Sequence, residues 1–173
     1  MHLLLHLALA TVLALTTSVG AATTHLRFYM HDTVTASASS PSTAALIVKG
    51  VAKLPNDPVN RFGDVYAIDD PLTEGPELSS ALVGRARGFY MFASLTDGTL
   101  LLSATMEFTA GKLNGSSVSV LARDAILDEV RELPVVGGTS GLRGATGYGL
   151  LRTQSYNPSN NNAVLKIDMY LKV

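Results

Sequence analysis

The stretch LLLSATMEFT, residues 100–109, alternates between two kinds of side chain along most of its length. One face carries the apolar residues Leu100, Leu102, Ala104, Met106 and Phe108. Because successive side chains of a strand point to opposite faces, this pattern predicts a β-strand with one face in a core. The stretch AVLKIDMYLKV, residues 163–173, repeats the pattern, with apolar positions separated by lysine, aspartate and tyrosine.

Working outward from these two stretches, we expect six more strands, at residues 26–34, 44–53, 62–68, 82–94, 117–123 and 145–156. Segments rich in Gly, Pro, Asn and Ser separate them, and only residues 124–131 fit a helical turn. Strands without intervening helices predict an all-β fold, either a sandwich or a barrel. We expect an eight-stranded antiparallel up-and-down β-barrel, because closure removes exposed edges and such a barrel can hold one small ligand.

The first 22 residues, MHLLLHLALATVLALTTSVGAA, contain no Asp, Glu, Lys or Arg. With small residues at Gly20 and Ala22, this segment predicts a secretory signal peptide. A membrane anchor is the alternative, but His6 and a Thr-Thr-Ser stretch interrupt a run that is already short for a span. We therefore expect a secreted protein whose single mature domain, residues 23–173, has 173 − 22 = 151 residues.

The composition excludes several classes of function. The chain has no cysteine, so packing alone must hold the domain together, although secretion would permit disulfides. The net charge of −1 gives no indication of a nucleic-acid-binding surface or a polybasic membrane patch. His25 and His31 are the histidines that remain after the signal peptide, so we expect no His/Cys metal site and no Ser-His-Asp hydrolase.

Two strands place an aspartate on their apolar face. In FYMHDT, residues 28–33, Asp32 shares a face with Phe28 and Met30, and in SVSVLARD, residues 117–124, Asp124 ends an apolar series in the same way. Burial of an unpaired carboxylate is costly, so the position of each acid needs an explanation.

One explanation is a ligand pocket at a barrel mouth, with an apolar lining and a few polar groups. Arg131 follows Asp124 by seven residues, and Tyr90 shares a face with Phe92 and with small residues that leave space beside its ring. An acid whose pKa is raised by burial can donate a proton and take it back. The alternative is that each acid hydrogen-bonds a local turn, or that Asp124 and Arg131 form a rim ion pair of little consequence.

Three further segments carry motifs that have both a functional and a structural interpretation. DDPLTEGPELSS, residues 69–80, is too irregular for a strand and fits a mouth loop, which is a lid, a subunit contact or an ordinary turn. GGTSGLRGATGYG, residues 137–149, lacks the ending of a phosphate-binding loop and fits flexible barrel corners. The triplet NGS, residues 114–116, makes Asn114 an N-glycosylation acceptor in an exported chain.

Four motifs together resemble the plant dirigent proteins over residues 25–173: FYMHD, FGDVYAIDDPLTEG, LVGRARGFY and RELPVVGGTSGLRGATGYG. The resemblance implies a secreted, often glycosylated protein of the apoplast or cell wall. It implies an eight-stranded barrel similar to lipocalins and allene oxide cyclase. It also implies homo-oligomers, either trimers or dimers. It implies a role in steering two monolignol phenoxy radicals, such as those of coniferyl alcohol, into one stereoisomer of a lignan. A separate laccase or peroxidase supplies the radicals. Some relatives instead close a ring in a quinone methide, as in pterocarpan formation.

The resemblance assigns the catalytic groups to Asp32, Asp124, Arg131 and Tyr90. The triplet ARD at residues 122–124 departs from the family's ADP-type motif, and the chain lacks the cysteine pair of many lignan-forming members. These departures leave the substrate open.

In this predicted pocket, we expect Phe28, Met30 and Phe92 to contact the substrate. Phenol oxidation needs a metal, haem or flavin, and the sequence offers no site for one, so no cofactor is expected. The protein would orient what another enzyme has oxidised. Two alternatives remain: a non-catalytic, lipocalin-like binder of phenolics, and a structural or defence-related wall protein.

Overall fold

The computed structural model describes residues 23–38, 40–55, 57 and 59–173, so the expected signal peptide, residues 1–22, lies outside the described residues. The strands are β1 (Thr23–Asp32), β2 (Ala44–Val48), β3 (Ala52–Lys53), β4 (Arg61–Phe62), β5 (Val65–Thr73), β6 (Leu82–Phe92), β7 (Thr99–Phe108), β8 (Ser117–Ala125), β9 (Arg131–Thr139), β10 (Thr146–Asn157) and β11 (Asn162–Lys172). Two short 3₁₀ helices, η1 (Gly111–Leu113) and η2 (Ser140–Leu142), follow β7 and β9.

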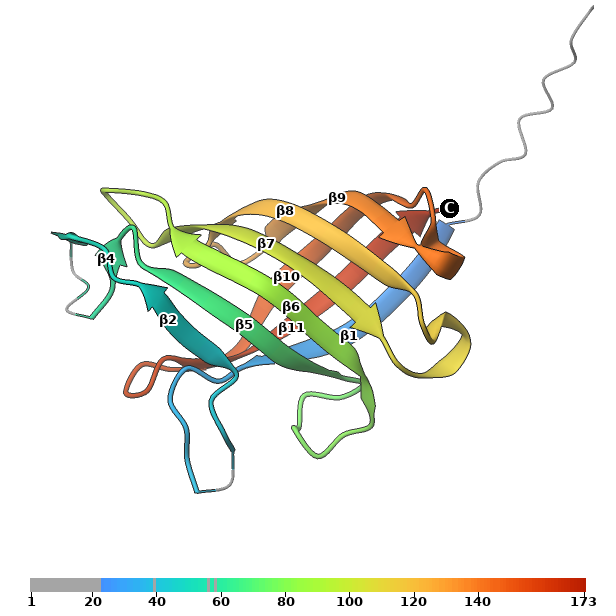
Figure 1. Ribbon diagram of the computed structural model, residues 1–173, viewed down its shortest axis with the longest axis horizontal. Coiled ribbons are helices and arrows are strands. Elements are labelled where there is room, and N and C mark those ends of the chain that lie inside the picture. The colour runs from blue at the N-terminus through green and yellow to red at the C-terminus, as the bar shows by residue number, and fades with distance from the viewer. Residues whose placement is uncertain (1–22, 39, 56, 58) are drawn as a thin grey trace, which may run out of the picture.

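Eight antiparallel strands form a closed barrel in the order β1, β11, β10, β9, β8, β7, β6 and β5. The barrel closes where β1 pairs with β5, at Tyr29 opposite Thr73 and Met30 opposite Leu72. The tilted strands and their enclosed interior are visible in Figure 1. The expectation of an eight-stranded antiparallel barrel is therefore confirmed.

The membership of the barrel differs from the expectation in one strand. The expected strand 44–53 splits into β2, which lies beside β5, and β3, which pairs with β4 in a separate small sheet. Its place in the barrel is taken by β9, although the sequence predicted a helical turn at 124–131 and loop glycines after it. The prediction failed there because β9 begins with a buried arginine and ends in glycines, so it lacks the apolar alternation of the other strands.

Strand β5 is longer than expected, because it continues through Pro71 to Thr73 instead of leaving the sheet at residue 68. Proline has no backbone N–H to donate and is tolerated in a strand where no ladder bond is needed. On this side of β5 the pairing with β2 ends at Ile68, and the pairing with β1 begins at Leu72. Pro71 lies in this interval, so the segment 69–73, expected as a mouth loop, is part of the barrel wall.

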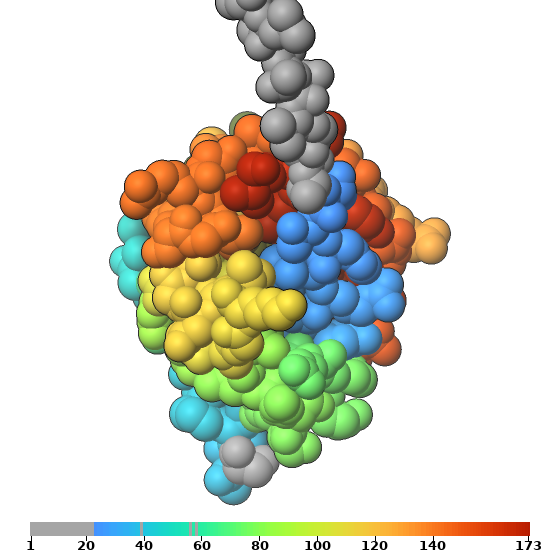
Figure 2. All heavy atoms as spheres, turned by 90° about the vertical axis from the view of Figure 1, so that its right-hand side faces the viewer, coloured from blue at the N-terminus to red at the C-terminus, as the bar shows by residue number. Residues whose placement is uncertain are grey.

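The two ends of the barrel are built differently. At the end that holds the chain termini, Phe108, Leu142 and Ala145 are buried beneath the turns that contain η1 and η2. Figure 2 looks at this end and shows a continuous surface of atoms. The opposite end is where β1, β6 and β8 finish and where β7 and β9 begin, and this end carries the predicted site (Figure 1). Within the described part of the chain, no helix is long and apolar enough to cross a membrane.

Candidate functional site

The four predicted catalytic residues all lie at this second end of the barrel and form two pairs. Asp32 ends β1 and interacts with Tyr90 of β6, whereas Asp124 near the end of β8 contacts Arg131 at the start of β9. Asp124 and Arg131 are only 5% and 4% exposed. A weak ion pair at a solvated rim, which was one interpretation of the sequence, does not fit this burial.

The Asp124–Arg131 pair is a buried ion pair with incomplete hydrogen bonding. Arg131 Nε lies 3.0 Å from Asp124 Oδ1, yet neither atom has a hydrogen-bond partner, because the N–H is not aimed at the oxygen. Arg131 Nη1 instead donates to Thr153 Oγ1 and to the Ile126 carbonyl, each at 2.9 Å. Burial raises the pKa of Asp124, and the Arg131 charge opposes that rise.

Asp32 has no cationic partner of this kind. Burial raises its pKa to about 7, and the neighbouring Tyr90 hydroxyl opposes that rise. Its Oδ1 atom is buried without a hydrogen-bond partner among the described residues. Burial, followed by the charge of Asp32, raises the pKa of Tyr90, so this phenol remains a proton donor.

A third acid, Asp70, belongs to this site and was missed in the sequence. It is completely buried, and its Oδ1 accepts a 2.6 Å hydrogen bond from Thr43 Oγ1. Burial, reinforced by the Asp32 charge, raises its pKa to about 8. Asp70 follows Tyr66 and Ile68 at alternate positions, so strand alternation, which identified Asp32, would also identify Asp70. Asp70 was missed because the expected strand ended at residue 68.

Aromatic rings from two strands surround the acids. The rings of Tyr66 and Tyr90 stack with centroids 5.0 Å apart, and Phe92 meets both rings edge-on at 6.4 Å. The space expected beside Tyr90 is thus occupied by Tyr66. Gly88, which lies opposite Ile68, permits close strand packing, since a Cβ there would stand 2.1 Å from the Ser103 carbonyl oxygen.

The three predicted substrate contacts lie in the core. Phe28 and Met30 are almost fully buried, and the ring of Phe28 packs edge-on against Phe108 at 5.8 Å. Phe92 is the member of this set that reaches the aromatic cluster beside the acids. A role of these side chains in substrate contact remains a prediction.

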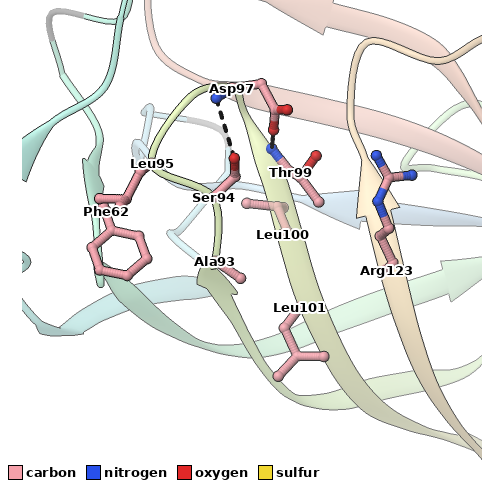
Figure 3. A pocket seen from close by; sticks show the side chains of 9 residues that line it. All are labelled: Phe62, Ala93, Ser94, Leu95, Asp97, Thr99, Leu100, Leu101 and Arg123. Carbon is pink, nitrogen blue, oxygen red and sulfur yellow. Dashed lines mark hydrogen bonds between the residues drawn. The ribbon is translucent and has the colours of Figure 1, made fainter.

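Two depressions mark the outside of the same barrel end. The larger, of about 650 Å³, lies between Phe62, the turn at residues 93–97 and the start of β7, with Leu100 and Arg123 in its wall (Figure 3). The smaller, of about 310 Å³, is lined in part by Arg131. Asp32 and Asp70 are in the wall of neither depression.

The remaining predicted position, Asn114, lies far from the acids. It is exposed in the turn after η1, at the end of the barrel that holds the termini. Ser116 of the same sequon is buried, and its hydroxyl accepts a hydrogen bond from the Gly141 N–H. Among the described residues, no group of three His, Cys, Asp or Glu is placed to hold a metal ion.

Comparison with known proteins gives consistent results. The family described as "Dirigent-like protein" matches residues 23–172. Pterocarpan synthase 1 of Glycyrrhiza echinata is 42% identical over 154 residues, which cover 86% of this chain and 77% of the relative. Dirigent protein 21 of Arabidopsis thaliana is 38% identical over 148 residues, covering 86% and 76%. A solved pterocarpan synthase dirigent protein superposes with a TM-score of 0.79 at 38% identity, covering 87% of this chain and 84% of that one.

Proposed function

The chain belongs to the dirigent family, and from this premise we propose that its barrel binds a quinone methide and directs ring closure to one stereoisomer. The observation that carries the proposal is a set of buried polar atoms inside an apolar barrel. In the part of the chain that the structure describes, Asp32 Oδ1, Asp70 Oδ2, Asp124 Oδ1 and Arg131 Nε have no hydrogen-bond partner. Buried polar groups are nearly always paired, so these four atoms are suited to the oxygens of a bound molecule.

Ring closure in a quinone methide needs proton transfers but no oxidant. The oxygen of a substrate hydroxyl bonds to the methide carbon, and the electrons of the exocyclic double bond move through the ring to the carbonyl oxygen. The carbonyl oxygen takes up one proton and the hydroxyl releases one, so the product is an isomer of the substrate. The site must therefore offer one proton and accept one.

The residues of the site suit these two tasks. The Asp32 carboxyl, with a pKa of about 7 and no cation beside it, donates the proton to the carbonyl oxygen. The Asp124 carboxylate accepts the hydroxyl proton, and the Arg131 guanidinium orients the oxygens. Tyr90 holds Asp32 and presents its ring to the substrate. The fixed geometry of the barrel wall determines which face of the methide carbon is attacked.

Stereoselective coupling of monolignol radicals to a lignan is the second candidate. It is supported by the motifs that resemble the plant dirigent proteins over residues 25–173. A separate laccase or peroxidase would supply the radicals. Once the two radicals join, a bis-quinone methide remains, and its closure would require the same acid groups.

A product assay separates these functions. The mature chain, residues 23–173, is incubated with a quinone methide that carries a free phenolic hydroxyl, and separately with coniferyl alcohol and a laccase. Products are resolved by chiral chromatography. The proposal predicts an excess of one enantiomer in the first reaction, whereas an excess only in the second would identify the radical-coupling function. Racemic product in both, formed more slowly than without protein, would identify a non-catalytic binder.

We also propose that copies of this chain associate through the outer face of β5 to β8. Ala67, Phe89, Ser103 and Leu121 are neighbours across these strands, and Phe89 and Leu121 are 41% and 48% exposed. On the side of this row toward Arg87, the charged groups are paired within the chain, because Arg87 contacts both Asp69 and Glu107. An apolar row with a neutralised border suits a second copy of the same surface.

Light scattering after size-exclusion chromatography tests this association. A charge at Phe89, introduced as Phe89→Asp, should convert the oligomer to a monomer, because it places an unpaired carboxylate in the contact. Val136→Asp is the matched control, since Val136 is exposed on β9 and lies outside the row. An unchanged mass for Phe89→Asp, or an equal loss in both variants, would contradict the proposal.

Secretion and glycosylation of Asn114 are also proposed. Because Ser116 is buried, its hydroxyl is out of reach in the folded domain, so the glycan would be added before the turn has folded. Expression in a secretory host should give a glycosylated chain. The refolded, unglycosylated domain should not accept a glycan from oligosaccharyltransferase, whereas the denatured chain should.

A further inference from the structure

The acidic side chains in the barrel wall fall into two kinds. Asp168 accepts hydrogen bonds from Arg27 Nε at 2.7 Å and from His25 Nε2 at 2.9 Å, and Asp124 lies beside Arg131. Asp32 and Asp70 have hydroxyl groups as neighbours instead: the Tyr90 hydroxyl acts on Asp32, and Thr43 Oγ1 donates a hydrogen bond to Asp70 Oδ1. A cation stabilises the ionised form of an acid far more than a hydroxyl does, so the two kinds differ in how readily they lose a proton.

Asp32 and Asp70 lie just beyond the point where β1 and β5 close the barrel. The pairing of β1 with β5 joins Tyr29 to Thr73 and Met30 to Leu72 and ends there. Past this point Thr43 bridges the two strands, because its N–H donates to the Thr33 carbonyl and its hydroxyl donates to Asp70 Oδ1. Asp32 and Asp70 both belong to the inward-facing series of their strands. The two carboxyls also influence each other electrostatically. Each has one buried oxygen without a partner, Oδ1 of Asp32 and Oδ2 of Asp70.

We propose that Asp70 is a positioning residue that shares a proton with Asp32, so that the pair still carries an acid when the substrate binds. Two like charges in a buried, apolar setting repel each other strongly, so the second carboxyl keeps its proton when the first has lost its own. Thr43, the residue directly before β2, donates the hydrogen bond that holds Asp70 in place. Asp32 touches the substrate, and Asp70 acts on the reaction through Asp32.

The groups around the pair preserve this arrangement. Tyr66 and Tyr90 face Asp32 with raised pKa values, so both phenols stay neutral. Arg85 is the cation that acts on Asp70, and it is held on the outer face by an ion pair with Asp69. No cation among the described residues contacts either carboxyl of the pair.

The shared proton also defines the kind of substrate. A carboxyl pair that holds one proton can donate to a neutral carbonyl oxygen, but when both are ionised it repels a phenolate or a carboxylate. The inference about substrate rests on the proposed function and specifies it as a neutral quinone methide. The inference that the two acids share a proton does not depend on the identity of the substrate.

The first test compares Asp70→Asn with Asp69→Asn. Both variants remove one carboxylate from neighbouring positions of β5, but Asp69 is exposed on the outer face. In the wild-type protein, the rate of stereoselective ring closure should fall above about pH 8, where the pair loses its last proton. In Asp70→Asn, Asp32 is the remaining acid, and the fall should move by about one pH unit, to about pH 7. Asp69→Asn should keep the wild-type profile.

The second test needs no substrate. Urea denaturation is followed from pH 5 to pH 9 for the wild-type protein and both variants. A carboxyl with a raised pKa in the folded state binds its proton more tightly there than in the unfolded chain, so stability falls as pH rises through this range. The denaturation midpoint of wild type should therefore fall with pH, and that of Asp70→Asn should fall less. Asp69→Asn should follow the wild-type curve.

The two tests fail separately. If the wild-type protein shows no stereoselective product but Asp70→Asn flattens the stability curve, the proposed function is wrong and the shared proton stands. If the product forms but the Asp70→Asn pH profile and stability curve both match wild type, the shared proton is wrong. Equal effects of Asp69→Asn and Asp70→Asn would also overturn the inference, because they would indicate a general effect of charge.

Discussion

The Asp124–Arg131 pair and the Asp32–Asp70 pair lie in the same barrel, yet they differ in chemistry. Both lie on inward faces of strands, with Asp70, Asp124 and Arg131 buried and Asp32 half-buried, and each contains buried atoms without a hydrogen-bond partner among the described residues. Arg131 offsets part of the desolvation of Asp124, whereas the two carboxyls of the other pair add repulsion to desolvation. The difference teaches that a neighbouring charge modifies what burial does to an aspartate: Arg131 opposes the rise in the pKa of Asp124, whereas the Asp32 charge adds to the rise in the pKa of Asp70.

The largest effect should come from removing the proton donor. Asp32→Asn preserves the shape of the side chain but cannot donate a carboxyl proton, so the rate of stereoselective closure should fall by about 100-fold or more. Chiral chromatography of products measures the loss. Asp57→Asn, at an acid on an exposed turn, is the control and should keep full activity. A variant at Asp32 with wild-type enantiomeric excess would remove the distinction between the two pairs.

Removal of the cation from the other pair should lower stability. Arg131→Met leaves Asp124 buried without a positive partner, which should lower the free energy of unfolding by about 3–5 kcal/mol at neutral pH. Because the loss of Arg131 raises the pKa of Asp124 further, the deficit should shrink as the solution becomes acidic and the carboxyl takes up a proton. Urea denaturation at two pH values measures both effects.

The double variant Asp124→Asn with Arg131→Met sharpens this result. It removes the Asp124 charge, which Arg131→Met leaves buried without a positive partner, so much of the lost stability should return. Should the double variant be as unstable as Arg131→Met alone, the loss would come from packing of the arginine and not from the ion pair.

The smallest effect concerns Thr43, the hydroxyl that holds Asp70. Thr43→Val keeps the side-chain shape but removes the donor, so the pKa of Asp70 should rise and stability above pH 8 should fall by about 1 kcal/mol. Thr105→Val is a matched control, because Thr105 bonds Ser119 on the outer face. Equal pH dependence in the two variants would show that Thr43 has no special relation to the acid pair.

Strand alternation was enough to predict the barrel and the unusual positions of Asp32 and Asp124. It failed at Asp70 because the segment 69–80, rich in Pro, Gly and acids, was expected to be a loop, although Pro71 needs no ladder bond at its position. It failed at β9 because an arginine faces inward there, where the pattern calls for an apolar residue. Both failures fall beside the site, where polar side chains on inward faces disturb the pattern that identifies a strand.

The pairing of Asp32 with Asp70 was beyond the sequence for a different reason. It depends on how β1 meets β5 across the closure of the barrel, and these strands are separated along the chain by β2, β3 and β4. The contact between Tyr66 and Tyr90 likewise depends on the register of β5 against β6. Alternation within one strand gives the face of a residue but not its neighbour on the next strand.

Carbon-detected NMR titration of the aspartate carboxyl groups tests the central distinction most directly. The ¹³C-labelled mature domain is titrated without substrate, and resonances are assigned with the Asp32→Asn, Asp70→Asn and Asp124→Asn variants. The account predicts that Asp32 and Asp70 titrate together near pH 7 to 8, while Asp124, whose charge Arg131 stabilises, loses its proton at a lower pH than that pair. If Asp32 and Asp70 instead lose their protons independently at the ordinary pKa of an aspartate, the account is contradicted.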